Sequence, residues 1–128
     1  MCYLWKSSKQ TCVALSTAEA EYVALSAATQ EAIWLQKLLS EFKLDKLKPL
    51  TINEDKQSAL SMSKAIKDHG TGKHIDIKFH YVNDIVNSGN INLKYCPTKN
   101  MLADIFTKGL PRERFSRLRM LLRMRSSL

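Results

Sequence analysis

The segment Pro49-Leu50-Thr51-Ile52-Asn53-Glu54-Asp55, residues 49–55, is a short stretch with β-branched Thr51 and Ile52 that ends in two acidic residues. Short runs with β-branched residues are typical of strands. Gln57 to about Lys67 follows at once, with apolar residues at helical spacing. A strand that passes directly into a helix is half of a βαβ unit, so we expect an α/β fold. Asp55 would lie at the carboxyl end of the strand, where open α/β sheets place ligands.

A long helix is expected before this strand, from about Ser16 to Phe42. The run Ser16-Thr17-Ala18-Glu19 has the capping-box pattern, so Glu19 is interpreted as a capping residue. Apolar residues at three- and four-residue steps predict the buried face of this helix: Ala20, Val23, Ala24, Ala27, Trp34, Leu35, Leu38 and Phe42. Trp34 is therefore expected in the core.

The remaining elements follow from the same patterns. Residues 3–15 favour extended structure, as a hairpin or one bent strand. Apolar spacing over 75–85 predicts a helix, and the alternation over 91–95 predicts a strand. Asn100 is expected to cap a short helix over 101–108, and a basic amphipathic helix follows Pro111. The expected order is β-α-β-α-α-β-α-α, an α/β chain with a small sheet.

Positive charge is concentrated near the C-terminal end of the sequence. The net charge is +8, and all six arginines follow Pro111 against one acid, Glu113, which gives that segment +5. Such an excess favours polyanionic partners, nucleic acid first. Residues 1–110 are interpreted as the main domain and 111–128 as a basic amphipathic tail. Phosphate binding by this tail, and docking through its apolar residues with the arginines in water, are equal alternatives; a membrane-surface role is less favoured.

Several classes of protein are not indicated. The chain has 128 residues, enough for one domain, and no apolar run of about 18 residues, so we expect no membrane partner. The first residues lack the pattern of a secretory signal. Three cysteines without a CxxC pair, and histidines at 69, 74 and 80, match no structural zinc pattern. We expect reduced thiols and an intracellular location, cytoplasmic or nuclear.

Five segments in order carry a resemblance to a known family. They are Trp5–Gln10, Val13–Tyr22, Asp55–Leu60, Lys73–His80 and Ala103–Lys108. Together, over about residues 5–122, they resemble the ribonuclease H domain of copia-type LTR retrotransposon Pol polyproteins. The resemblance implies a ribonuclease H-like mixed sheet with flanking helices. It also implies hydrolysis of the RNA strand of RNA/DNA hybrids during reverse transcription, with the remainder of a Pol polyprotein as context.

The resemblance also implies a site for two Mg²⁺ ions. Glu21 resembles the helix carboxylate of the family, Asp55 the strand-end carboxylate and Asp104 the last carboxylate. Two metals can activate a water and stabilise the leaving oxygen of a phosphodiester, and Mg²⁺ prefers oxygen ligands. Contacts to nucleic acid are predicted at six basic residues: Lys9, Lys73, His74, Lys99, Arg119 and Arg123.

The sequence departs from the family pattern in three ways. The family's first catalytic Asp precedes the tryptophan motif, and only four residues precede Trp5 here, so that Asp and the first two strands are expected to be missing. Lys56 stands where the family usually has Asn, and Glu54 is an additional acid, interpreted as a surface residue in preference to a poor substitute for the missing Asp. We therefore expect a weak or inactive nuclease, whose unpaired strand edges favour self-association.

Two alternatives to this nuclease stay open. One is a non-catalytic basic module that binds nucleic acid or another partner, with no need for metal. The other is a retroelement-derived reading frame without a present function, poorly folded because its sheet is incomplete.

Overall fold

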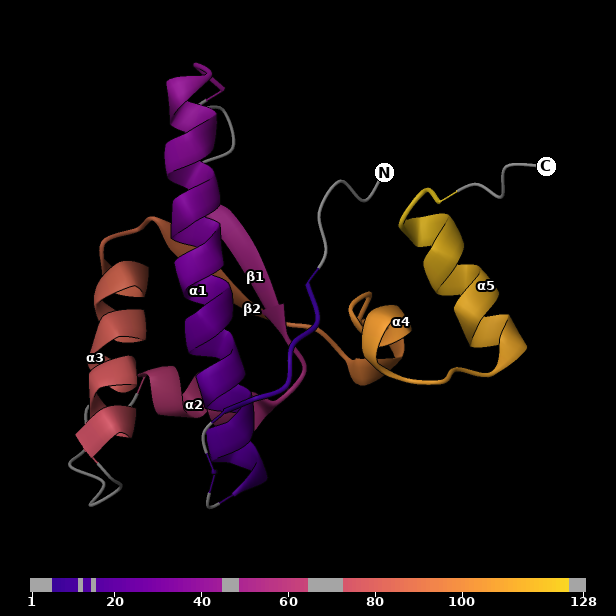
Figure 1. Ribbon diagram of the computed structural model, residues 1–128, viewed down its shortest axis with the longest axis horizontal. Coiled ribbons are helices and arrows are strands. Elements are labelled where there is room, and N and C mark those ends of the chain that lie inside the picture. Colours follow the sequence, from indigo (N-terminus) through magenta and orange to yellow (C-terminus); the bar gives the residue numbers. More distant parts are fainter. Residues whose placement is uncertain (1–5, 12, 15, 45–48, 65–72, 125–128) are drawn as a thin grey trace. The chain divides into compact units, whose positions relative to one another are not determined.

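The computed structural model describes residues 6–11, 13–14, 16–44, 49–64 and 73–124 (Figure 1). The chain divides into two compact units. Cys12–Tyr95 form one unit, with α1 (Thr17–Glu41), β1 (Leu50–Glu54), α2 (Gln57–Lys64), α3 (Lys73–Asn87) and β2 (Ile91–Tyr95). Met1–Thr11 and Cys96–Leu128 form the other, with the 3₁₀ helix η2 (Thr98–Asn100), α4 (Asp104–Thr107) and α5 (Arg112–Leu121). The predicted division at residue 110 stays a prediction.

The two strands form a parallel pair in which Leu50 is opposite Ile91 and Glu54 is opposite Tyr95. Parallel neighbours need a crossover connection, and here α2 and α3 lie in it. The strand-to-helix pattern after Pro49 therefore predicted the βαβ unit correctly. The α/β class is confirmed, whereas the ribonuclease H-like arrangement of the sheet stays a prediction.

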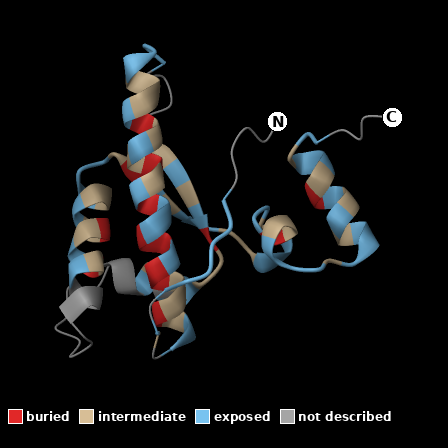
Figure 2. Cartoon of the chain, viewed as in Figure 1, coloured by how far each residue is buried: buried red, intermediate tan, exposed pale blue. Residues whose placement is uncertain are grey.

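The core of the larger unit lies where α1 and α3 cover one face of this sheet. Tyr22 and Leu25 of α1 pack with Phe79 and Val82 of α3. The rings of Tyr22 and Phe79 stack with centroids 4.1 Å apart, a geometry that adds about 0.5–1.5 kcal/mol beyond the burial itself. Ile52 of β1 packs against the same cluster, as does Leu93 of β2. Figure 2 shows the buried positions as a stripe along α1.

The predicted buried face of α1 was right only in part. Of the eight residues assigned to it, Val23 is buried, Ala20, Leu35 and Leu38 are half-buried, and the other four are exposed, Trp34 by 54%. Polar residues occupy much of the real buried face because they form hydrogen bonds there. Thr29 Oγ1 donates to the Leu25 carbonyl at 2.9 Å, and Gln36 Nε2 donates to the Asn90 carbonyl at 2.6 Å. The spacing of apolar residues in the sequence therefore did not identify the polar residues of the buried face.

Two other elements differ from their predictions. The strand predicted over 3–15 is absent from residues 6–11 and 13–14, where a polar run has no partner strand among the described residues; residues 1–5, 12 and 15 lie outside the described residues. The helix predicted over 101–108 begins only at Asp104, and the side chain of Asn100 does not cap it. Residues 98–100 form a separate 3₁₀ turn instead.

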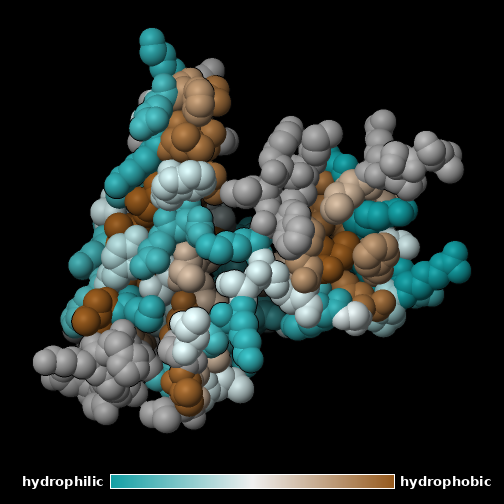
Figure 3. All heavy atoms as spheres, viewed as in Figure 1, coloured by the Kyte–Doolittle hydropathy of each residue, from teal (hydrophilic) through white to brown (hydrophobic). Residues whose placement is uncertain are grey.

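Hydrophobic side chains also lie on the surface of the larger unit. Trp34, Phe42 and Leu44 are exposed, and Figure 3 shows apolar residues gathered towards the C-terminal end of α1. No helix among the described parts of the chain combines the length and apolar character needed to cross a membrane.

Candidate metal centre

Three carboxylates from two elements meet at one end of the larger unit. Glu21 lies in the first turns of α1, Glu54 is the last residue of β1, and Asp55 follows it. One carboxylate oxygen from each lies within 4.8 Å of the others. Glu21 and Asp55 are 34 positions apart in the sequence and were predicted to share a site. The fold brings them together.

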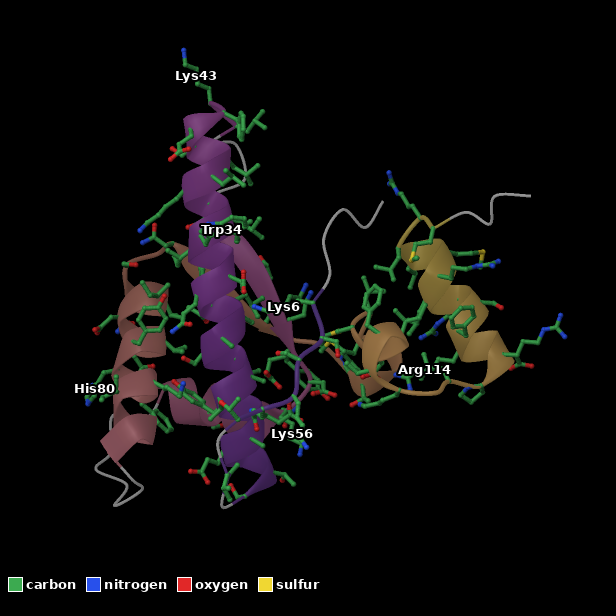
Figure 4. The ribbon with its side chains drawn as sticks, viewed as in Figure 1. Lys6, Trp34, Lys43, Lys56, His80 and Arg114 are labelled. Atoms are coloured by element: carbon green, nitrogen blue, oxygen red, sulfur yellow. The ribbon has the colours of Figure 1, made fainter. Side chains whose placement is uncertain are left out.

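Local features of the sequence set this geometry. Ser16 Oγ accepts a hydrogen bond from the Glu19 amide at 3.1 Å, so α1 begins where the capping box predicted. Glu21 precedes Tyr22, whose fully buried ring ties this part of α1 to the core. Figure 4 shows Lys56 just beyond the end of β1, beside the N-terminal half of α1. The carboxyl end of the strand and the start of the helix thus converge.

Glu54 is buried, with 7% of its surface exposed, so its interpretation as a surface residue was wrong. Alternation along β1 places Glu54 on the same face as Ile52, towards the helices. Burial raises the pKa of the Glu54 carboxyl; the Lys56 amide, which donates to Oε1 at 3.0 Å, acts against that rise, and the charges of Glu21 and Asp55 add to it. Sequence reasoning could have found this residue from its even spacing after Leu50 and Ile52.

The donor set fits a hard divalent cation. Mg²⁺–oxygen distances of about 2.0–2.1 Å put two opposite ligands about 4 Å apart, and the longer bonds of Ca²⁺ extend this to about 5 Å. The three oxygens lie within 4.8 Å of one another, which is close to that range. All three donors are carboxylates, the ligand type that Mg²⁺ and Mn²⁺ prefer over nitrogen and sulfur.

Asp104 belongs to the other unit, where Lys108 and Arg114 bind its carboxylate. Its predicted role as a metal ligand stays a prediction. Lys108 Nζ lies 2.9 Å from Oδ1, and an Arg114 Nη lies 2.5 Å from Oδ2. The carboxylate is 6% exposed. Burial acts to raise the pKa of Asp104, but the hydrogen bonds and charges of Lys108 and Arg114 outweigh it and hold the pKa below its ordinary value.

Two arginines of α5 form hydrogen bonds within the protein, a role that neither phosphate binding nor exposure to water had predicted. Arg114 also donates to the Thr98 carbonyl, and Arg117 donates to the Lys99 carbonyl and to Asn100 Oδ1. Leu118 is the fully buried apolar residue of this helix, whereas Phe115 is 43% exposed. Two arginines therefore fasten α5 to the turn at 98–100 within the smaller unit.

The exposure of the side chain is known for four of the six residues that were predicted to contact nucleic acid. Lys9, Lys99 and Arg123 are exposed, and Arg119 is half-buried. Lys73 and His74 lie in the first turn of α3, and their side chains are outside the described ones. The contacts themselves stay predictions.

Comparison with known proteins gives strong matches over nearly the whole chain. It is 37% identical over 123 residues to the retrovirus-related Pol polyprotein from transposon TNT 1-94 of Nicotiana tabacum, a match that covers 96% of this chain. The chain is homologous to a retrotransposon Pol region. The Pol polyproteins from transposons RE1 and RE2 of Arabidopsis thaliana are 33% and 32% identical over 111 residues, 87% of this chain.

This Pol-related chain corresponds to a small part of its relatives. It covers 9% of the tobacco polyprotein and 8% of each Arabidopsis one. No family model matches the chain, and no solved structure matches it. The comparisons therefore support a retrotransposon origin.

Proposed function

We propose that this Pol-related chain is a ribonuclease H-like region whose ancestral activity is hydrolysis of the RNA strand of RNA/DNA hybrids. The observation that carries the proposal is that the fold brings together the carboxylates of Glu21 and Asp55, both of which the family resemblance implies as metal ligands. Homology to transposon Pol polyproteins supports the same context. The remainder of such a polyprotein is the proposed partner, and the proposed location is intracellular.

The carboxylates of Glu21 and Asp55 would serve the reaction as ligands for the metal. Glu21 and Asp55 would hold Mg²⁺ with carboxylate oxygens, and α1 and β1 fix the distance between them. Bound there, the metal would supply charge stabilisation and an activated water for phosphodiester hydrolysis. The exposed Lys9 and Lys99 are proposed to contact the phosphates of the hybrid.

Activity of the 128-residue chain alone is expected to be weak or absent. Its sequence contains no Asp or Glu before Glu19, whereas the family resemblance calls for a catalytic Asp upstream of the tryptophan motif. The missing carboxylate would leave the metal pair incompletely held. A longer chain that supplies this strand and its Asp is expected to restore cleavage.

The test is cleavage of an end-labelled RNA/DNA hybrid in Mg²⁺ and in Mn²⁺. The 128-residue chain, a version extended upstream with Pol sequence from a relative, and Glu21→Gln in each background are compared. We expect cleavage by the extended chain and its loss in Glu21→Gln. Cleavage that persists in Glu21→Gln would contradict the proposed site, and no cleavage by a folded, extended chain would contradict the proposed activity.

A second candidate is metal-independent binding of nucleic acid by the smaller unit. It is favoured by the exposure of Lys99, Arg112 and Arg123 on and near α5. Neutralising Arg112, Arg119 and Arg123 together should flatten the dependence of binding on salt, since each phosphate contact adds to that slope. Asp104→Asn should leave nucleic-acid affinity unchanged at a temperature where the variant is folded. A salt slope that survives the triple substitution would refute this candidate.

A further inference from the structure

We propose that Glu54 is itself a metal ligand in this chain, the third carboxylate of the centre formed with Glu21 and Asp55. The inference rests on the proposed function, because it assumes that this centre binds a divalent metal. The family resemblance gives Glu54 no role and treats it as a departure. The proposal therefore concerns a property of this chain's own sequence.

The position of Glu54 supports this role. The residue ends β1 on the inward face and is nearly fully buried, and its carboxylate reaches the same small volume as those of Glu21 and Asp55. A buried carboxylate beside two others is unfavourable unless a proton or a cation compensates the charge. A bound divalent cation would compensate all three at once.

A purely structural role is the competing explanation. Oε1 of Glu54 accepts the Lys56 amide at 3.0 Å and so helps form the turn between β1 and α2. Glutamine at this position keeps an oxygen that can accept the same hydrogen bond, but it removes the negative charge. Glu54→Gln therefore separates the two roles: a structural acceptor is retained and an anionic ligand is lost.

The experiment measures Mn²⁺ binding by calorimetry, together with the unfolding temperature with and without Mn²⁺. Glu54→Gln, Glu21→Gln and Asp55→Asn are compared with Glu41→Gln, which makes the same change at an exposed position at the end of α1. We expect Glu54→Gln to weaken Mn²⁺ binding at least tenfold and to reduce the Mn²⁺-induced rise in unfolding temperature. Glu41→Gln should stay within twofold of the parent chain.

The outcomes separate this inference from the proposed function. Unchanged Mn²⁺ affinity in Glu54→Gln, with loss in Glu21→Gln and Asp55→Asn, overturns the role of Glu54 and leaves the site intact. Mn²⁺ affinity unchanged from the parent chain in all three variants, or no Mn²⁺ binding by the parent chain, overturns both.

Loss of binding together with a lower metal-free unfolding temperature calls for a second variant. Glu54→Asp keeps the charge on a side chain one methylene shorter. It must bind Mn²⁺ more tightly than Glu54→Gln does, and equally weak binding in the two variants overturns the inference.

Discussion

Asp104 and Glu54 are both buried carboxylates, yet the side chains that act on them carry opposite charges. Asp104 is flanked by Lys108 and Arg114, whereas Glu54 lies beside Glu21 and Asp55. Lys108 and Arg114 lower the pKa of Asp104 despite its burial, whereas burial raises the pKa of Glu54 and the charges of Glu21 and Asp55 add to that rise. The first carboxylate gains stability from its own chain. The second lies close to two other acidic side chains, an arrangement that favours binding of a cation more than stability of the fold.

The comparison also bears on the resemblance, which assigned Asp104 and Asp55 the same kind of role. Lys108 and Arg114 engage both oxygens of Asp104, so this residue contributes to the smaller unit without a metal. Asp55 instead lies in a cluster with two other acids.

The largest expected effect comes from removing the packing that brings α1 to the strands. Tyr22→Ala should destabilise the larger unit by about 3–5 kcal/mol, because Tyr22 is fully buried and stacks on Phe79. It should also abolish Mn²⁺ binding, since Glu21 adjoins Tyr22. Urea unfolding followed by circular dichroism measures the loss. Tyr22→Phe, which keeps the ring, is the control and should bind Mn²⁺ like the parent.

How far the sequence predicts these regions depends on what each pattern measures. The run after Pro49 predicted a strand because β-branched residues such as Thr51 and Ile52 favour strand geometry directly, and β1 forms there. The capping box located the start of α1 for a similar local reason. Trp34 was misplaced because apolar periodicity cannot identify Thr29 and Gln36 as buried hydrogen-bonding residues. Tertiary contacts decided that face.

The candidate site was predictable only in part. Motif resemblance paired Glu21 with Asp55 across 34 positions, which no local pattern could do. It missed the burial of Glu54, although the residue's place two positions after Ile52 indicated its inward face. The ion pairs of Asp104 were not predictable, because Arg114 reaches it from the following helix, ten positions away.

The next largest effect is expected from weakening the ion pairs of Asp104. Asp104→Asn should destabilise the smaller unit by about 1.5–3 kcal/mol, because two charge-assisted hydrogen bonds are weakened and Arg114 is left partly unpaired. Hydrogen exchange of the α5 amides reports this loss locally. Glu113→Gln, an exposed acid on α5 itself, is the matched control, and equal exchange in both variants would contradict the role of the Asp104 pairs.

Acid should reproduce part of this effect. The pKa of Asp104 is lowered in the folded state, so its stabilising contribution is complete above the ordinary carboxyl pKa. The contribution is lost as the pH falls from that value through the lowered one. Protection of α5 should therefore decline below about pH 4 in the parent chain. Asp104→Asn should show a smaller decline over the same range, and equal declines would exclude Asp104 as the titrating group.

The smallest effect has the opposite sign. Without metal, Glu21→Gln should stabilise the larger unit slightly, by about 0.2–1 kcal/mol, because it removes one of three neighbouring negative charges. Chemical denaturation at low salt measures the change, and added salt should reduce it. A clear loss of stability would mean that the cluster is held by interactions that offset its repulsion.

The parallel pairing of β1 and β2 has a consequence for the order of folding. Leu50 aligns with Ile91, 41 positions later, so the register forms only after the whole crossover has closed. Such non-local pairing slows folding relative to helix formation, because a long loop must be ordered first. The ends of the strands are then set late, and with them the positions of Glu54 and Asp55. During synthesis, α1 can form while β2 is still unmade, so the acidic centre is completed only after the strands pair.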